Sequence, residues 1–164
     1  MQDFMEKKQR KDFINMNKLI IATVLMVVVY ACKSKNNLNP EPIADVPVNI
    51  TINMSLPQYD RLLQTNSFIY VDGGIKGVIV VHNMDDNFYA FERSCSYQPR
   101  NSCAKIEVDS IFSLFRCGES KAGKFEICCD SKFLFDGEVY AGPATFGLKH
   151  YQVFRNGNVL EIKN

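Results

Sequence analysis

The sequence predicts an all-β fold, and three observations support this prediction. Short runs of β-branched and aromatic residues recur about every ten residues from Val48 to the C-terminus. Glycine-containing turn dipeptides separate several of these runs, and no long stretch carries apolar residues at helical spacing. This arrangement is typical of an antiparallel β sandwich or barrel.

The first half of this region reads as strands joined by turns. Residues 48–54 alternate apolar and polar side chains, as expected of a half-buried strand, and residues 55–63 can form a short helical turn. Further strands are predicted at residues 67–71, 78–81 and 88–91. Because residues 78–81 are an unbroken β-branched run, we expect that strand to be buried on both faces.

The second half contains two hairpin signals. It begins with three candidate strands, at residues 104–109, 111–116 and 124–127. A turn is predicted at residues 118–123, before the third of these strands. The dipeptides Asp136-Gly137 and Asn156-Gly157 each lie between two apolar runs, which indicates β-hairpins. The expected hairpin strands are residues 133–135 with 139–140 and residues 152–154 with 159–162.

Length, composition and charge narrow the class of protein. A chain of 164 residues is expected to hold one domain, and 46% apolar residues are enough for a core. The 19 basic and 18 acidic side chains nearly balance, so no nucleic-acid partner is expected. The sequence has two histidines, His82 and His150, which limits the imidazole ligands for a metal centre.

The N-terminal residues resemble a bacterial export signal. Residues 19–30 form an apolar run preceded by basic residues, and the run is shorter than the roughly 20 residues that span a membrane. Residues 29–32 (VYAC) resemble a lipobox, which implies cleavage before Cys32 and lipid attachment to it. We therefore expect residues 1–31 to be a signal peptide, starting at Met1 or Met16. An uncleaved N-terminal anchor is the alternative.

A tether is expected between this signal and the folded unit. Residues 32–47 hold the lipidated cysteine, three prolines and no apolar periodicity, which favours a flexible segment. The β domain would then be residues 48–164. Removal of residues 1–31 leaves 14 basic and 15 acidic side chains, which is a net charge of −1. No partner that binds by charge is therefore implied. The expected location is the bacterial cell envelope, on the periplasmic side or at the cell surface, anchored by lipid in the membrane.

Six cysteines are many for a chain of this length. If Cys32 carries lipid, five remain in an oxidising compartment, and this odd number leaves at least one thiol free, metal-bound or paired between chains. The Cys-x-x-Cys pairs that are typical of structural zinc sites are absent from the sequence. Cys128 and Cys129 are adjacent, so in a strand their side chains would point to opposite faces.

Residues 133–144 resemble the end of the second cluster-binding box of Rieske proteins. The match includes the spacing from Gly137 to Gly142 and the triplet Gly142-Pro143-Ala144. Residues 87–95 resemble the strand that leads into the first box. The resemblance covers residues 48–164 and extends to degenerate Rieske-fold lipoproteins of Bacteroidetes-type bacteria. It implies a Rieske-like antiparallel β sandwich or barrel with a small cluster-binding-type subdomain.

The resemblance also implies a changed ligand set. In the first box Cys95 occupies the cysteine position and Tyr97 the histidine position. In the second box Glu126 occupies the cysteine position and Cys129 the histidine position. Both imidazoles of a Rieske [2Fe–2S] centre are therefore missing. The site would be vestigial or atypical, and any metal would be held by Cys95 and Cys129. The resemblance further implies a disulfide that involves Cys128, for which Cys103 is the candidate partner.

These features predict a non-catalytic binding or structural protein of the envelope, without a cofactor and with an envelope protein as its partner. It is not expected to be an enzyme, because no other catalytic constellation stands out. Disulfides Cys95–Cys129 and Cys103–Cys128 would then replace the crosslinking that a cluster supplies.

Two alternatives remain. One is an electron-transfer protein with an atypical [2Fe–2S] cluster, held by Cys95, Cys129 and one further cysteine out of Cys103, Cys117 and Cys128. The other is a thiol–disulfide protein that uses the adjacent pair Cys128-Cys129.

Overall fold

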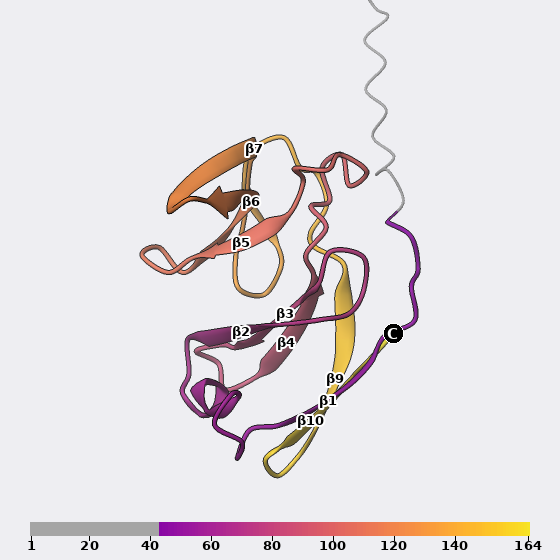
Figure 1. The fold of residues 1–164 in the computed structure, drawn as a ribbon, viewed down its shortest axis with the longest axis vertical. Coiled ribbons are helices and arrows are strands. Elements are labelled where there is room, and N and C mark those ends of the chain that lie inside the picture. The colour runs from indigo at the N-terminus through magenta and orange to yellow at the C-terminus, as the bar shows by residue number, and fades with distance from the viewer. Residues whose placement is uncertain (1–42) are drawn as a thin grey trace, which may run out of the picture. The chain divides into compact units, whose positions relative to one another are not determined.

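The computed structural model describes residues 43–164, and the expected signal peptide, Cys32 and the tether up to residue 42 lie outside this range. Residues 43–164 form ten strands and one 3-10 helix, η1 (Asp60–Leu63), in two antiparallel sheets (Figure 1). The all-β prediction is therefore confirmed. Within the described part of the chain, no helix is long and apolar enough to cross a membrane.

The larger sheet has six strands in the order β1-β10-β9-β4-β3-β2. Because β1 pairs with β10 and β2 pairs with β3, the first two strands of the chain form the two edges of this sheet. The bounds of its strands are β1 Asn49–Asn53, β2 Ser67–Val71, β3 Val78–His82, β4 Phe88–Glu92, β9 His150–Asn156 and β10 Val159–Lys163.

The β3 strand lies between two hydrophobic clusters, which explains its unbroken β-branched sequence. Alternate side chains point to opposite faces of a strand. Ile79 and Val81 pack into one cluster with Phe91, while Val78 and Val80 pack into the other. The expectation that this strand is buried on both faces is thus confirmed, since every residue of β3 is buried.

The smaller sheet has four strands in the order β5-β6-β7-β8. Its strands are contiguous in the sequence and lie beside the larger sheet in Figure 1. Their bounds are β5 Ile106–Asp109, β6 Leu114–Lys121, β7 Lys124–Phe133 and β8 Val139–Ala141. Phe115 and Phe133 of this sheet pack against Phe91 of β4 in one hydrophobic cluster, so the two sheets share a core.

The predicted turn at residues 118–123 is wrong in its extent. Residues 118–121 continue β6, and Lys121 pairs with Lys124 across a two-residue turn at Ala122 and Gly123. Both turn residues have positive φ, which matches the right-handed twist of a hairpin. The strand predicted at residues 111–116 likewise begins only at Leu114, because Ile111 and Phe112 are exposed in the preceding turn.

The residues before β1 contact the C-terminal end of the domain. Lys149 donates hydrogen bonds to Asp45 at 2.8 Å and to the Ala44 carbonyl at 3.2 Å. The amide side chain of Asn164 hydrogen-bonds Asp45 and the backbone of Val48. The last residues of the expected tether therefore join the folded unit.

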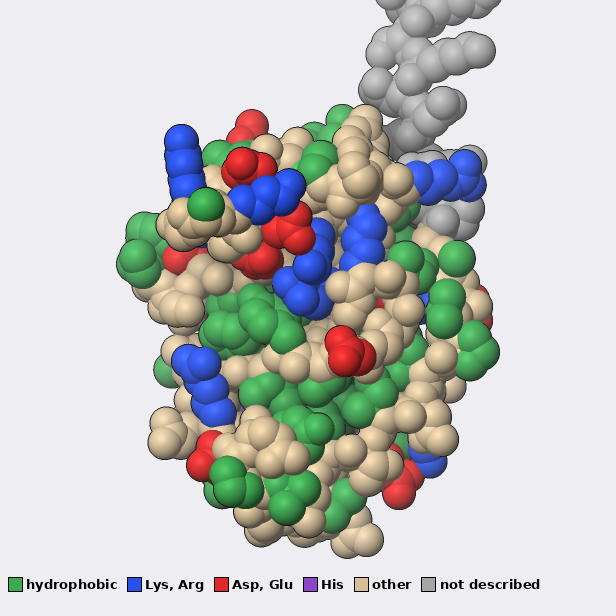
Figure 2. Space-filling view, in the orientation of Figure 1, with side chains coloured by type: hydrophobic (Ala, Val, Ile, Leu, Met, Phe, Trp, Pro, Cys, Tyr) green, Lys and Arg blue, Asp and Glu red, His purple; other side chains and the backbone are tan. Residues whose placement is uncertain are grey.

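The surface carries both signs of charge side by side. Figure 2 shows basic and acidic side chains mixed across one face, with hydrophobic side chains between them. Arg93 lies 3.8 Å from Glu107, and Lys105 lies 3.3 Å from Glu119. This pairing agrees with the near balance of charges in the sequence.

A buried carboxylate joins β4, β9 and the loop before β3 of the larger sheet to the start of the segment that leads into the smaller sheet. Glu92 at the end of β4 accepts hydrogen bonds from the backbone N–H groups of Ile75, Lys76 and Ser94 and from the hydroxyl of Tyr151. The loop before β3 comes closest to the Glu92 carboxylate at Gly74. A Cβ at this position would lie 2.2 Å from the carboxylate, and the φ angle of Gly74 is +60°. Glycine is therefore required there.

We expect Glu92→Gln to lower the free energy of unfolding by about 3 kcal/mol, because the amide N–H₂ would face donors and leave them unsatisfied. Tyr151→Phe removes one donor to the same carboxylate and should cost about 1.5 kcal/mol. Chemical denaturation measures both values. Glu138→Gln, at an exposed position, is the control and should stay within about 0.5 kcal/mol of wild type. A Glu92→Gln variant as stable as this control would contradict the role of Glu92.

Candidate functional site: a cluster of three thiols

Three cysteines from separate segments meet in the shared core. Cys95 follows β4, Cys117 lies in β6 and Cys129 lies in β7. Their sulfur atoms all lie within 4.8 Å of one another. Cys95 and Cys117 are buried, while Cys129 is half-buried, so the cluster reaches the surface at Cys129. We refer to these three side chains as the thiol cluster.

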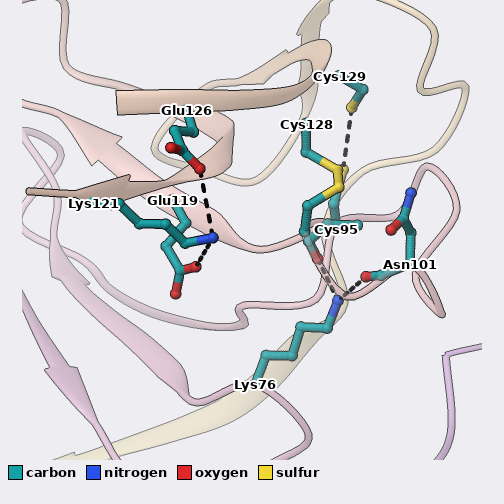
Figure 3. Close-up of a disulfide and its surroundings, with 10 residues drawn as sticks. Lys76, Cys95, Asn101, Glu119, Lys121, Glu126, Cys128 and Cys129 are labelled. Carbon is teal, nitrogen blue, oxygen red and sulfur yellow. Dashed lines mark hydrogen bonds and ion pairs between the residues drawn. A yellow bond between two sulfur atoms is a disulfide. The ribbon is translucent and has the colours of Figure 1, made fainter. Parts of the chain in front are cut away.

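The loop that carries Cys95 is held by its backbone and by one lysine. The N–H of Cys95 donates to the carbonyl of Ala104, which closes the loop between them. The Lys76 ammonium donates to the carbonyls of Asn101 and Ala104, at 2.6 and 2.8 Å (Figure 3). Since Lys76 is itself held by Glu92 through its backbone, the loop position is fixed from the larger sheet.

A bulge between β6 and β7 directs Cys129 toward the other two cysteines. Arg116 pairs with Lys132, but Gly118 pairs with Ile127, so β7 has several extra residues opposite Cys117. Cys129 lies in this excess length. Bulges re-aim side chains beside functional sites, and here the bulge places the Cys129 sulfur 3.9 Å from that of Cys95.

Cys103 and Cys128 form a disulfide with a Cα–Cα distance of 5.4 Å. It links the loop after β4 to β7, beside the thiol cluster (Figure 3). This is the pair that the resemblance implied. The second expected crosslink, Cys95–Cys129, is not formed, because both of these cysteines are free.

The environment of Cys117 and Cys129 disfavours their thiolate forms. A hydrogen bond with Cys95 and then burial raise the pKa of Cys117 far above its usual range. Burial and a hydrogen bond with Cys117 raise the pKa of Cys129. Because the thiolate is the reactive form of cysteine, these thiols are poor nucleophiles at neutral pH.

The other residues expected at the site are placed differently. Tyr97 is half-buried and packs against the hydrophobic cluster that contains Cys95. Glu126 is exposed in β7, where it pairs with Glu119 across the sheet and forms an ion pair with Lys121 (Figure 3). The structure therefore does not bring Glu126 to the thiol cluster.

Neither histidine contributes an imidazole to the cluster. The ring of His82 is buried with both nitrogens in hydrogen bonds, to the Leu62 carbonyl and to Asp86. His150 is exposed at the start of β9 and is absent from the group of potential ligands.

Cys117 is the member of the cluster that the resemblance does not point to. It occupies none of the positions of the two boxes. From the sequence it is only one of three cysteines that could be a third thiol ligand. One local signal was available: Phe115 and Cys117 lie on either side of the polar Arg116, so in a strand they share one face, which is the buried face of β6.

Comparisons with known proteins found several solved structures that are similar to this chain, among them the following two. The cyanobacterial plasma membrane Rieske protein PetC3 from Synechocystis PCC 6803 is 19% identical, with 73% of this chain and 100% of that chain covered and a TM-score of 0.48. The ferredoxin of carbazole 1,9a-dioxygenase from Nocardioides aromaticivorans IC177 is 17% identical, with 72% and 97% covered and a TM-score of 0.42. No family model and no curated protein matches the chain.

We expect the double variant Cys103→Ser/Cys128→Ser to lose about 3–4 kcal/mol of unfolding free energy, because the disulfide closes a loop with a sequence separation of 25 residues. Urea denaturation with and without reductant measures the loss. Wild type should fall to the level of the variant on reduction, while the variant itself should not respond. The exposed neighbour Ser102→Ala is the matched control. Equal stability of wild type in both conditions would contradict a stabilising disulfide.

Proposed function

We propose that the chain is an exported lipoprotein, anchored by lipid on Cys32 in the bacterial cell envelope, whose Rieske-like β domain has a non-catalytic binding or structural role. Its partners would be the membrane, through the anchor, and another envelope protein. The observation that carries this proposal is the Cys103–Cys128 disulfide, which joins the loop after β4 to β7. A covalent link there supplies the stability that a bound cluster would otherwise give.

The residues present do not fit a Rieske [2Fe–2S] centre. Such a centre needs two cysteines on one iron and two imidazoles on the other. Among residues 43–164, His82 has both ring nitrogens bonded elsewhere, and two of the five cysteines are in the disulfide. The three remaining sulfurs lie within 4.8 Å of one another, which provides one compact ligand set rather than two separate pairs.

The same geometry does not favour thiol–disulfide chemistry at Cys128-Cys129. Cys128 is bonded to Cys103 rather than to its neighbour, and the pKa of Cys129 is raised by burial. A nucleophilic cysteine needs a lowered pKa instead. These contacts support a role in binding or structure.

One observation, the thiol cluster itself, favours the alternative function of electron transfer. Iron analysis distinguishes electron transfer from the non-catalytic role. We expect the full chain, purified anaerobically from cells with intact Fe–S assembly, to be colourless and to lack stoichiometric iron and acid-labile sulfide. Cys95→Ser should then leave the absorption spectrum unchanged. Two irons and two sulfides per chain, with a visible absorption band that this variant loses, would establish electron transfer and overturn the non-catalytic proposal.

Lipid anchoring is tested separately at Cys32. We expect Cys32→Ser to move the chain from the membrane fraction to the soluble envelope fraction, because the thiol that accepts the lipid is removed. Fractionation and a radiolabelled fatty acid measure the two properties. Ser34→Ala, two residues away, should remain lipidated and membrane-bound. Label on the Cys32→Ser variant would show that the anchor lies elsewhere.

A further inference from the structure

The thiol cluster is a set of ligands that the proposed function does not use. Cys95, Cys117 and Cys129 are the free cysteines among residues 43–164, and no two of their sulfurs are more than 4.8 Å apart. We propose that these three side chains bind one thiophilic divalent metal ion, for which Zn²⁺ is the best-fitting example.

The distances suit one tetrahedral ion. Zn–S bonds of about 2.3 Å at tetrahedral angles place the sulfurs about 3.8 Å apart. The Cys95 and Cys129 sulfurs are 3.9 Å apart, and the third sulfur lies within the 4.8 Å limit of both. Little movement is therefore needed to close three thiolates around a single ion.

The ligands come from three segments that are fixed independently. The loop of Cys95 is closed through Ala104 and held by Lys76, while Cys117 lies in a central strand of the smaller sheet. Cys129 follows directly after Cys128, which the disulfide anchors. A site built on such fixed segments requires little ordering when a metal binds, and this favours affinity.

A polar side chain lies beside two of the proposed ligands. Ser131 lines the same pocket as Cys117 and Cys129. It is fixed there, since it is buried and accepts a hydrogen bond from the Ala144 N–H. Polar groups next to metal ligands orient the ligands and tune the metal.

The local charge matches a divalent ion. Three thiolates and one divalent ion have a net charge of −1. The Lys76 ammonium, held against the loop carbonyls, interacts electrostatically with both Cys95 and Cys117. Its positive charge offsets the net charge of −1 that a divalent ion leaves on three thiolates.

A small pocket gives access to the cluster. It has a volume of about 150 Å³ and is lined by Cys117, Cys129 and Ser131, together with Arg116 and Lys132. Because three protein ligands leave one tetrahedral position open, this pocket can supply a water molecule or a small ligand as the fourth donor. A water occupies about 30 Å³ in the liquid, so the pocket is large enough.

The test is a Co²⁺ titration of the purified full chain, freed of metal with a chelator under argon. Cobalt–thiolate complexes absorb in the near ultraviolet, and tetrahedral ones also absorb strongly in the visible. We expect both bands to saturate at one Co²⁺ per chain and to disappear when one equivalent of Zn²⁺ is added.

Variants assign the ligands. Cys129→Ser, at the half-buried position, should weaken binding by at least about tenfold, the smallest loss expected even for a residue outside the first ligand shell. Cys95→Ser and Cys117→Ser should do the same. Ser102→Ala, at an exposed position, leaves the three ligands and the disulfide in place, so it should retain the cobalt bands.

A measurement on the wild-type chain avoids any folding defect of the variants. Zn²⁺ should slow the alkylation of Cys129, and a chelator should reverse this protection. The proposal is overturned if Co²⁺ produces no near-ultraviolet thiolate band, or if each of the three single variants binds Co²⁺ as tightly as wild type. It is overturned as well if the chain binds only Cu(I). It is also overturned if the isolated chain contains a disulfide within the thiol cluster.

Discussion

The buried carboxylate of Glu92 is the interaction on which the junction between the two sheets depends. Its oxygens accept hydrogen bonds from the loop before β3, from Ser94 shortly after β4 and from Tyr151 in β9. A carboxylate buried with four donors has no second arrangement of equal energy, because every donor would lose its partner. The segment that enters the loop of Cys95 is therefore fixed where it leaves β4, and Lys76 extends this order to Asn101 and Ala104.

The smaller sheet positions its cysteines by irregularity rather than by regular pairing. A straight ladder between β6 and β7 would place one β7 residue opposite Cys117, whereas the bulge accommodates the segment that contains Cys128 and Cys129. Their side chains then serve two purposes, one as a covalent crosslink and the other as part of the thiol cluster. The exposed ion pair of Glu126 with Lys121 has little part in this, since surface ion pairs contribute little to stability.

Local chemistry in the sequence accounts for most of the fold. The β-branched run of β3 and the glycine turns of the hairpins were readable, because they depend on neighbours in sequence. In the last hairpin the two-residue loop is Gly157-Asn158 rather than Asn156-Gly157, since Asn156 pairs with Val159. The role of Cys117 was not readable, because it depends on a bulge and on contacts between distant segments, which no short spacing records. Glu126 occupied a matching position in the sequence, but the same bulge separates it from the thiols.

The pairing of β1 with β10 has a consequence for how the domain folds. Strands β5 to β8 are consecutive and can pair as soon as residues 106–141 are available. The first strand instead pairs with the last, with Asn49 opposite Lys163, so its contacts have almost the greatest sequence separation that the domain allows. Contacts of this kind form late, because a long loop must be closed before they stabilise the chain. A chain that is synthesised from its N-terminus must therefore keep β1 unpaired until β10 has been made, and β1 is the segment most exposed to wrong pairing in the meantime.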